Sequence, residues 1–154
     1  MKGNEKVITQ LNDRLADELT AINQYMVHAA LCNNWGYEKL HKAAEMRARG
    51  EMKHAEALID RILLLEGMPV VSKLNKITIG PTVQDQHAND HKLEQTAVIA
   101  YNESIAIAVS AGDNGSRELF ENNLEDEESH IDYLESQLAQ IRQMGIQNYL
   151  SEQV

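Results

Sequence analysis

The sequence predicts an all-α fold: a four-helix bundle with one long crossover connection and a short fifth helix at the C-terminal end. Apolar residues recur at helical spacing in four long segments of this 154-residue chain. Two of the three connections between these segments are short, whereas the middle one is about 15 residues long. The chain contains only two prolines, and its abundant Leu, Ala, Glu and Gln favour helix. We therefore expect one domain over residues 1–154, large enough to bury a core.

The first half of the chain is expected to form a helical hairpin. An apolar stripe predicts the first helix over residues 5–34, and the Asn-Asn-Trp-Gly sequence that ends at Gly36 predicts the turn. The second helix is expected over residues 38–66, with Gly67 as its stop. Residues 67–81 have no helical period, and an extended segment of this length spans about 45–50 Å. That reach permits a crossover along helices that are about 40–45 Å long.

The second half repeats this plan. A third helix is expected over residues 82–111, followed by a Gly-Asp-Asn-Gly turn. Ser116 is the expected N-cap of a fourth helix over residues 116–144. Gly145 interrupts the pattern, and residues 146–152 are expected to form the short fifth helix.

The charge and the cysteine count exclude several classes of protein. The formal net charge is −10, which disfavours nucleic acid as a partner and favours cations. Cys32 is the only cysteine, so the chain has no internal disulfide, as expected in a reducing cytosol. The chain starts without an apolar signal segment and contains no run of 18 apolar residues. We therefore expect a cytoplasmic protein without a membrane span.

An acidic phrase occurs twice, as "ELTAINQY" from Glu18 and "EQTAVIAY" from Glu94. Aligning the first phrase with the second also aligns two Glu-x-x-His motifs, "EMKH" from Glu51 and "EESH" from Glu127. The two halves of the chain thus carry the same pattern in the same register. The aligned set has six members: Glu18, Glu51 and His54 in the first half, and Glu94, Glu127 and His130 in the second.

The spacing predicts that these six side chains meet at one height in the bundle. In each half, the glutamate of the phrase and the Glu-x-x-His motif are about equally far from the turn between their helices. Residues i and i+3 share a helix face, so each motif points its glutamate and its histidine the same way. Four carboxylates buried together require compensation, which two divalent cations supply. Carboxylates with one imidazole per metal suit iron or manganese, and this ligand pattern is the one known from di-metal carboxylate bundles. A third motif, Glu38–His41, has no counterpart in the second half, where the aligned positions hold Asn114 and Arg117.

At these residues the chain resembles a known family. The segments "DELTAINQY", "NWGYEKL", "EMKHAEALIDRILLLEGMP", "DEESHIDYLESQLAQI" and "MGIQNYL" are similar to the bacterioferritins of the ferritin-like superfamily, and the match covers essentially the whole chain. The resemblance implies iron storage and detoxification by a ferroxidase that oxidises Fe(II) with dioxygen or peroxide, with ferric mineral kept inside a cage of 24 subunits built from two-fold dimers. It also implies a role for each site residue at an intra-subunit di-iron centre: Glu18 and Glu94 as terminal ligands, Glu51 and Glu127 as bridges, His54 and His130 with one iron each, and Tyr25 beside the centre.

The resemblance also implies a b-type haem. Met52 follows a ligand glutamate and therefore points about 100° away from the metal site, toward the outside of the bundle. In the bacterioferritins this position supplies an axial thioether from each subunit of a dimer, and the haem assists iron release. A small iron–sulfur ferredoxin is the expected reductant, with Met68 and its loop as the docking region. Four residues are expected to line the dimer interface: Leu19, Ile22, Asn23 and Met26.

The chain departs from the family at four positions. Some relatives have His and Asp at the positions of Met46 and Gly50, where they form an accessory iron site on the inner surface, and its absence is expected here. Glu45 and Arg49 replace aromatic and aliphatic residues near the haem. Gly50 costs about 1 kcal/mol in a helix interior relative to Ala. It either loosens the helix beside Glu51 during iron passage or is simply tolerated at an interface.

Two other functions remain open on the residues alone. One is a different di-metal enzyme, such as a manganese catalase or a rubrerythrin-like peroxidase, although a single cysteine excludes the Cys-x-x-Cys domain of rubrerythrins. The other is a haem or zinc carrier in which the buried site is only structural. Oxidation of Fe(II) distinguishes the ferroxidase from both.

Overall fold

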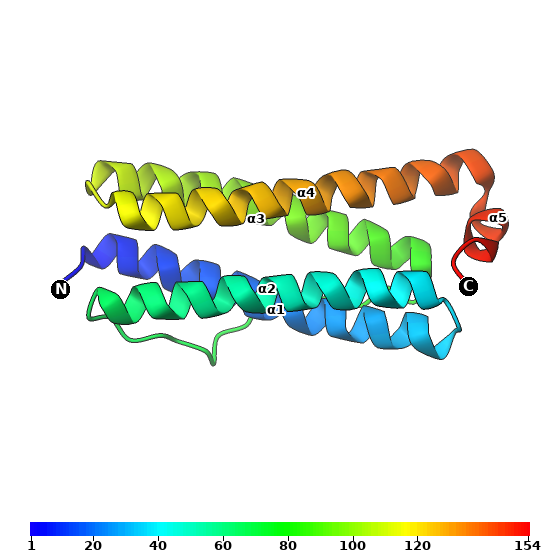
Figure 1. Ribbon diagram of the computed structural model, residues 1–154, viewed down its shortest axis with the longest axis horizontal. Coiled ribbons are helices and arrows are strands. Elements are labelled where there is room, and N and C mark those ends of the chain that lie inside the picture. Colours follow the sequence, from blue (N-terminus) through cyan, green and yellow to red (C-terminus); the bar gives the residue numbers. More distant parts are fainter.

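The computed structural model describes residues 1–154 as five α-helices without strands. Two long antiparallel hairpins lie against each other, one made of the first two helices and the other of the third and fourth (Figure 1). The N-terminus and the C-terminus lie at opposite ends of the bundle (Figure 1). This arrangement confirms the predicted fold class. The helices are α1 (Glu5–Asn34), α2 (Glu38–Leu64), α3 (Val83–Ser110), α4 (Asn114–Met144) and α5 (Ile146–Ser151).

The crossover between α2 and α3 covers residues 65–82 and runs along the bundle, so that α2 and α3 point the same way (Figure 1). It has no regular structure, and side chains of α1 satisfy several of its backbone N–H groups. These acceptors are Thr20 for Asn75 at 2.9 Å, Gln24 for Thr78 at 3.1 Å and His28 for Gly80 at 3.0 Å.

Helix α4 begins two residues earlier than expected, and Ser116 is not its N-cap. Asp113 caps the helix, because its carboxylate accepts a hydrogen bond from the Ser116 backbone N–H at 2.9 Å and another from the Ser116 hydroxyl at 2.7 Å. Arg61, at the end of α2, donates to the same carboxylate and to the Ser116 hydroxyl. A carboxylate held by a guanidinium is a stronger cap than a neutral hydroxyl.

Helix α2 ends two residues earlier than expected. Glu66 adopts a left-handed conformation with φ of 60°, and the Gly67 N–H donates to the Ile62 carbonyl at 2.9 Å. This geometry closes the helix in the way of a C-terminal capping motif. Gly67 was therefore a correct stop signal, but the chain leaves the helix before reaching it.

The apolar core is divided along the bundle. A large cluster that includes Leu11, Leu58 and Phe120 fills the end near the N-terminus, and Tyr149 of α5 covers a smaller cluster at the other end. A third, small cluster contains Ala21, Tyr25 and Ala48, and the buried polar side chains include Glu18, Glu51, Glu94 and Glu127. No helix contains an apolar stretch long enough to cross a bilayer.

Candidate metal centre

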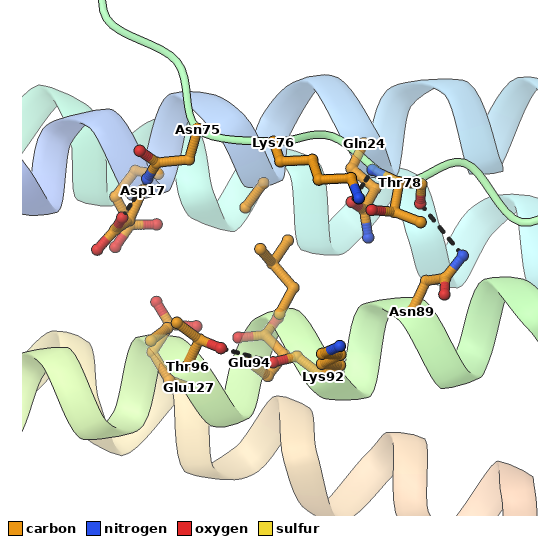
Figure 2. A pocket seen from close by; sticks show the side chains of 14 residues that line it. Asp17, Gln24, Asn75, Lys76, Thr78, Asn89, Lys92, Glu94, Thr96 and Glu127 are labelled. Atoms are coloured by element: carbon orange, nitrogen blue, oxygen red, sulfur yellow. Dashed lines mark hydrogen bonds between the residues drawn. The ribbon is translucent and has the colours of Figure 1, made fainter.

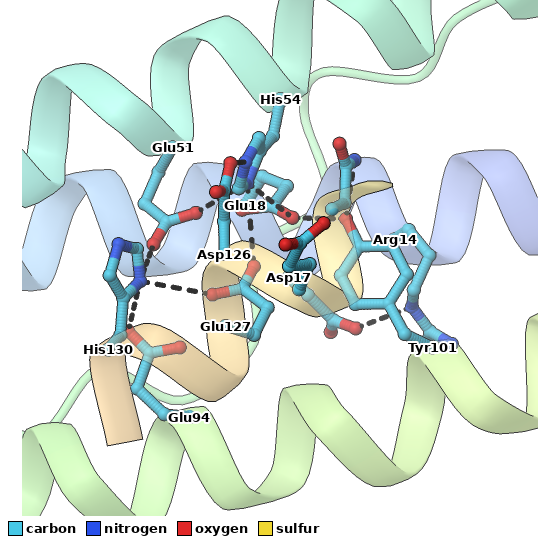
Figure 3. A network of polar contacts seen from close by, with 12 residues as sticks. Arg14, Asp17, Glu18, Glu51, His54, Glu94, Tyr101, Asp126, Glu127 and His130 are labelled. Carbon is cyan, nitrogen blue, oxygen red and sulfur yellow. Dashed lines mark hydrogen bonds and ion pairs between the residues drawn. The ribbon is translucent and has the colours of Figure 1, made fainter. Parts of the chain in front are cut away.

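The four long helices bring all six aligned residues together in the middle of the bundle (Figure 3). Five of the six are buried, and His130 is partly exposed. They form two groups whose ligand atoms lie within 4.8 Å of one another, and both groups use Glu51 and Glu127. The groups are Glu18, Glu51, His54 and Glu127, and Glu51, Glu94, Glu127 and His130.

Both histidines turn Nδ1 toward the carboxylates (Figure 3). Nδ1 of His54 lies 3.0 Å from Glu51 Oε2 and 3.5 Å from Glu127 Oε1. Nδ1 of His130 lies 3.0 Å from Glu51 Oε1 and 3.2 Å from Glu127 Oε2. Each histidine thus faces one oxygen of each shared glutamate, so the two halves of the site have equivalent inner contacts.

The four carboxyl groups divide into two with raised pKa values and two with lowered pKa values. Burial and the charge of neighbouring carboxylates raise the pKa of Glu18 and of Glu94 well above its ordinary value. Burial acts in the same direction on Glu51 and Glu127. Hydrogen bonds from His130 and His54 outweigh it, and the pKa of each of these two glutamates is lowered.

The histidines complete the charge balance. Burial alone would lower the pKa of His54 and His130, but hydrogen bonds to the surrounding glutamates outweigh burial. They raise the pKa of His130 to about 12 and raise the pKa of His54 as well. Two imidazolium ions therefore balance two carboxylates, and protons perform in this buried cluster the neutralising role that divalent metals perform in a loaded one.

Two tyrosines hold the outer carboxylates. The Tyr25 hydroxyl donates to Glu94, and the Tyr101 hydroxyl donates to Glu18. Tyr25 was predicted to lie beside the centre. Tyr101 was not predicted as a site residue, although it is the last residue of the second copy of the repeated phrase. Both are fully buried. Their surroundings differ, because the Arg47 guanidinium lies 4.6 Å from the centre of the Tyr25 ring, and the Tyr101 hydroxyl accepts from Asn123 at 3.0 Å.

A cavity of about 410 Å³ joins this cluster to the surface between α1, α3 and the crossover (Figure 2). Glu18, Glu94 and Glu127 line its buried part, and Lys76 and Lys92 are exposed at its border. Small ions and oxidants therefore have a path to the carboxylates that does not require the helices to separate.

Met52 lies on the opposite side of α2 from the cluster, with 44% of its surface exposed. It lines a groove of about 470 Å³ between α1 and α2, together with Ile22 and Met26. Of the other expected interface residues, Leu19 is half-buried on α1 and Asn23 is exposed beside the groove. The groove is mostly apolar and open to solvent, which is typical of a surface that another molecule covers.

The third Glu-x-x-His motif takes no part in the cluster. His41 lines the α1–α2 groove and places Nδ1 3.1 Å from the Ala29 carbonyl oxygen. Glu45 and Arg49 also line this groove and form an exposed ion pair of 3.3 Å. Met46 is 72% exposed.

Comparison with known proteins agrees with this geometry. The family model described as a ferritin-like domain matches residues 8–144. A bacterioferritin of Brucella melitensis biotype 1 is 43% identical over 149 residues, which cover 97% of this chain and 92% of that protein. A bacterioferritin of Streptomyces coelicolor is 42% identical over 98% of this chain and 90% of its own length. A bacterioferritin of Mycolicibacterium paratuberculosis is 38% identical over 99% of this chain and 96% of its own length.

Proposed function

This chain belongs to the bacterioferritins, within the ferritin-like proteins, and from that premise we propose that it stores iron by oxidising Fe(II) to Fe(III) at the buried cluster. One observation carries the proposal: the two groups of potential ligands overlap at Glu51 and Glu127. A carboxylate that belongs to both groups has one oxygen for each of two neighbouring metal ions. The overlap therefore supports a bridged pair of irons rather than two separate sites.

The residues fit two divalent metal ions in charge and in donor type. Four ionised glutamates carry four negative charges, which two divalent ions cancel without leaving a net charge in the interior. Carboxylate oxygens with one imidazole nitrogen per metal suit iron or manganese, and zinc would bind without changing its oxidation state. The six roles expected from the sequence, with Glu18 and Glu94 as terminal ligands, are therefore retained as part of the proposal.

Fe(II) is the substrate, and the protein contributes position and charge. Each of two bound Fe(II) ions gives up one electron. Together with two protons, these two electrons convert dioxygen to hydrogen peroxide or hydrogen peroxide to two molecules of water. Glu51 and Glu127 hold the pair close enough to serve one oxidant, which avoids one-electron oxygen products. Tyr25 and Tyr101 fix the two terminal carboxylates through their hydroxyl groups.

The cavity of Figure 2 is the proposed route for Fe(II) and for the oxidant. Asp17 attracts cations into it, whereas Lys76 and Lys92 reduce that attraction at the border. At its buried end, iron displaces protons from the carboxyl and imidazole groups that bind it.

We further propose that the α1–α2 groove is half of a b-type haem site, completed by a second copy across a two-fold axis. The fit rests on the apolar lining of the groove and on the thioether of Met52, which the structure leaves exposed within it. Haem bound by one Met52 from each subunit would supply one-electron transfer for the reduction and release of stored iron. A ferredoxin near Met68, whose side chain is 76% exposed, is the proposed reductant.

The assembly is proposed to be a cytosolic cage of 24 subunits that encloses the ferric mineral. Exposed apolar side chains on α1, α2 and the crossover, including Val27, Leu63 and Val71, are consistent with contacts between subunits. Size-exclusion chromatography tests this part of the proposal independently of the chemistry.

The proposed reaction is tested by adding Fe(II) to the metal-free protein without oxygen and then admitting air. The expected result is rapid oxidation of two irons per subunit, before slower mineral growth. Oxidation at the rate of buffer alone would contradict the proposal and leave a structural metal or haem carrier. Rapid turnover of peroxide without Fe(III) accumulation would instead indicate a catalase or peroxidase.

A further inference from the structure

His54 has a partner on the side away from the cluster. Its Nε2 lies 2.8 Å from Oδ2 of Asp126, the residue directly before Glu127 on α4 (Figure 3). A histidine that gives one ring nitrogen to a metal commonly donates its other N–H to a carboxylate. The Asp126 contact is therefore compatible with a loaded site, because a metal at Nδ1 leaves the Nε2 proton and its hydrogen bond in place.

His130 lacks such a partner. Its Nδ1 makes the corresponding contacts with the glutamates, but no protein group lies within hydrogen-bond distance of its Nε2. Its side chain is 18% exposed, against 7% for His54. The two imidazoles thus have equivalent inner contacts and different outer ones.

The sequence explains this difference. The register that places Glu51 on Glu127 also pairs Asp126 with Gly50, which has no side chain. A Cβ at Gly50 would meet no heavy atom within 4 Å, so packing does not require glycine there. The asymmetry therefore results from the residue present at position 50 and not from the shape of the bundle.

We propose that Asp126 is a positioning residue that makes the two metal subsites unequal. The subsite with His54 binds metal first and more tightly, and the subsite with His130 exchanges its metal more readily. This inference rests on the proposed function, because it concerns the same pair of metals. The cause is that Asp126 holds the ring of His54 in the binding orientation, fixes the proton on Nε2 and strengthens Nδ1 as a donor.

The expected difference in metal affinity depends on how far Asp126 is exposed to water. Loss of an outer partner of a metal-bound histidine typically costs 10–100-fold in metal affinity. Asp126 is 64% exposed, so water weakens its interaction with the imidazole. We therefore expect the lower end of that range, about a tenfold difference between the two subsites.

The two subsites are compared with Co²⁺, which binds without needing an oxidant. Crystals of the metal-free protein are equilibrated with one Co²⁺ per subunit, and anomalous scattering gives the occupancy beside each histidine. The unmodified protein is expected to show about tenfold more cobalt at His54 than at His130. Asp126→Ala should make the occupancies nearly equal, and Asp126→Ala combined with Gly50→Asp should reverse the preference. Asp132→Ala, which removes an exposed carboxylate elsewhere on α4, is the matched control and should retain the original ratio.

Each outcome of this experiment decides a separate point. Equal occupancy in the unmodified protein would overturn the inference but leave the paired metal site intact. An Asp126→Ala variant with the original ratio would also overturn it, since Asp126 would then be only a surface charge. Absence of cobalt among the glutamates of the unmodified protein would instead contradict the proposed function itself.

Discussion

Loading the cluster with two divalent metals should release more protons per subunit than a site whose ligands have ordinary pKa values. In the metal-free protein the pKa values of Glu18 and Glu94 are raised, mainly by burial, which favours the protonated form of these two carboxyl groups. The raised pKa values of His54 and His130 keep both imidazoles charged. Metal ligation requires all four groups to lose their protons. Glu51 has a lowered pKa, is already ionised and contributes none.

The expected number differs clearly from that of an ordinary site. At pH 6.5, an unperturbed glutamate is ionised and an unperturbed histidine is about half protonated. Two such histidines with four such glutamates would release about one proton in total. Release of more protons than this is therefore a measure of how strongly burial and the neighbouring charges alter this cluster.

Calorimetric titration with Zn²⁺ measures this release, because zinc does not change its oxidation state. The binding enthalpy is recorded at pH 6.5 in buffers of different ionisation enthalpy, and the slope gives the protons released. Affinity should rise with pH, since protons compete with metal for the same atoms. Release of about one proton, or affinity independent of pH, would refute the charge assignment. His41→Gln, which removes a histidine outside the cluster, should leave the number unchanged.

Three further predictions concern the ligands, the cap and the groove. Glu94→Gln should reduce Zn²⁺ binding from two ions to one per subunit, whereas Glu51→Gln should weaken both, because both groups use that residue; unchanged calorimetric stoichiometry in either variant would contradict the ligand sets. Asp113→Ala should destabilise the protein by about 1–2 kcal/mol in urea unfolding, through loss of the α4 cap, and no loss would contradict that role. Met52→Leu should abolish the haem absorption band of the purified protein, while Met46→Leu, on the same helix, should retain it; a retained band in the Met52 variant would place the haem elsewhere.

Much of the fold was predictable because the deciding signals are local or periodic. Long apolar stripes and glycine-containing turns defined four helices, and the length of the middle connection permitted the crossover. The ends of the helices were harder to predict. Asp113 and Ser116 are both good capping residues three positions apart, and the choice between them depends on Arg61, which comes from another helix.

The cluster was predictable for a different reason. A pattern repeated in both halves of the chain, combined with turns at equal distance, forces aligned residues to one height, and this argument needs no atomic detail. Tyr101 could have been found in the same way, since it aligns with Tyr25. The role of Asp126 could not have been found in this way, because it depends on the direction in which the His54 ring points. The aligned residue, Gly50, has no side chain and gives no sign that His130 lacks a partner. The cavity between α1, α3 and the crossover could not be predicted either, because it depends on how far the crossover lies from these helices.

The central claim is that the four buried glutamates bind a pair of metal ions, which neutralise them in the loaded protein. Crystals soaked in Fe(II) without oxygen and measured at the iron absorption edge test it most directly. Two anomalous peaks per subunit are expected, one beside His54 and one beside His130, with Glu51 and Glu127 between them. Glutamates turned toward solvent, with no iron density among them, would contradict the claim.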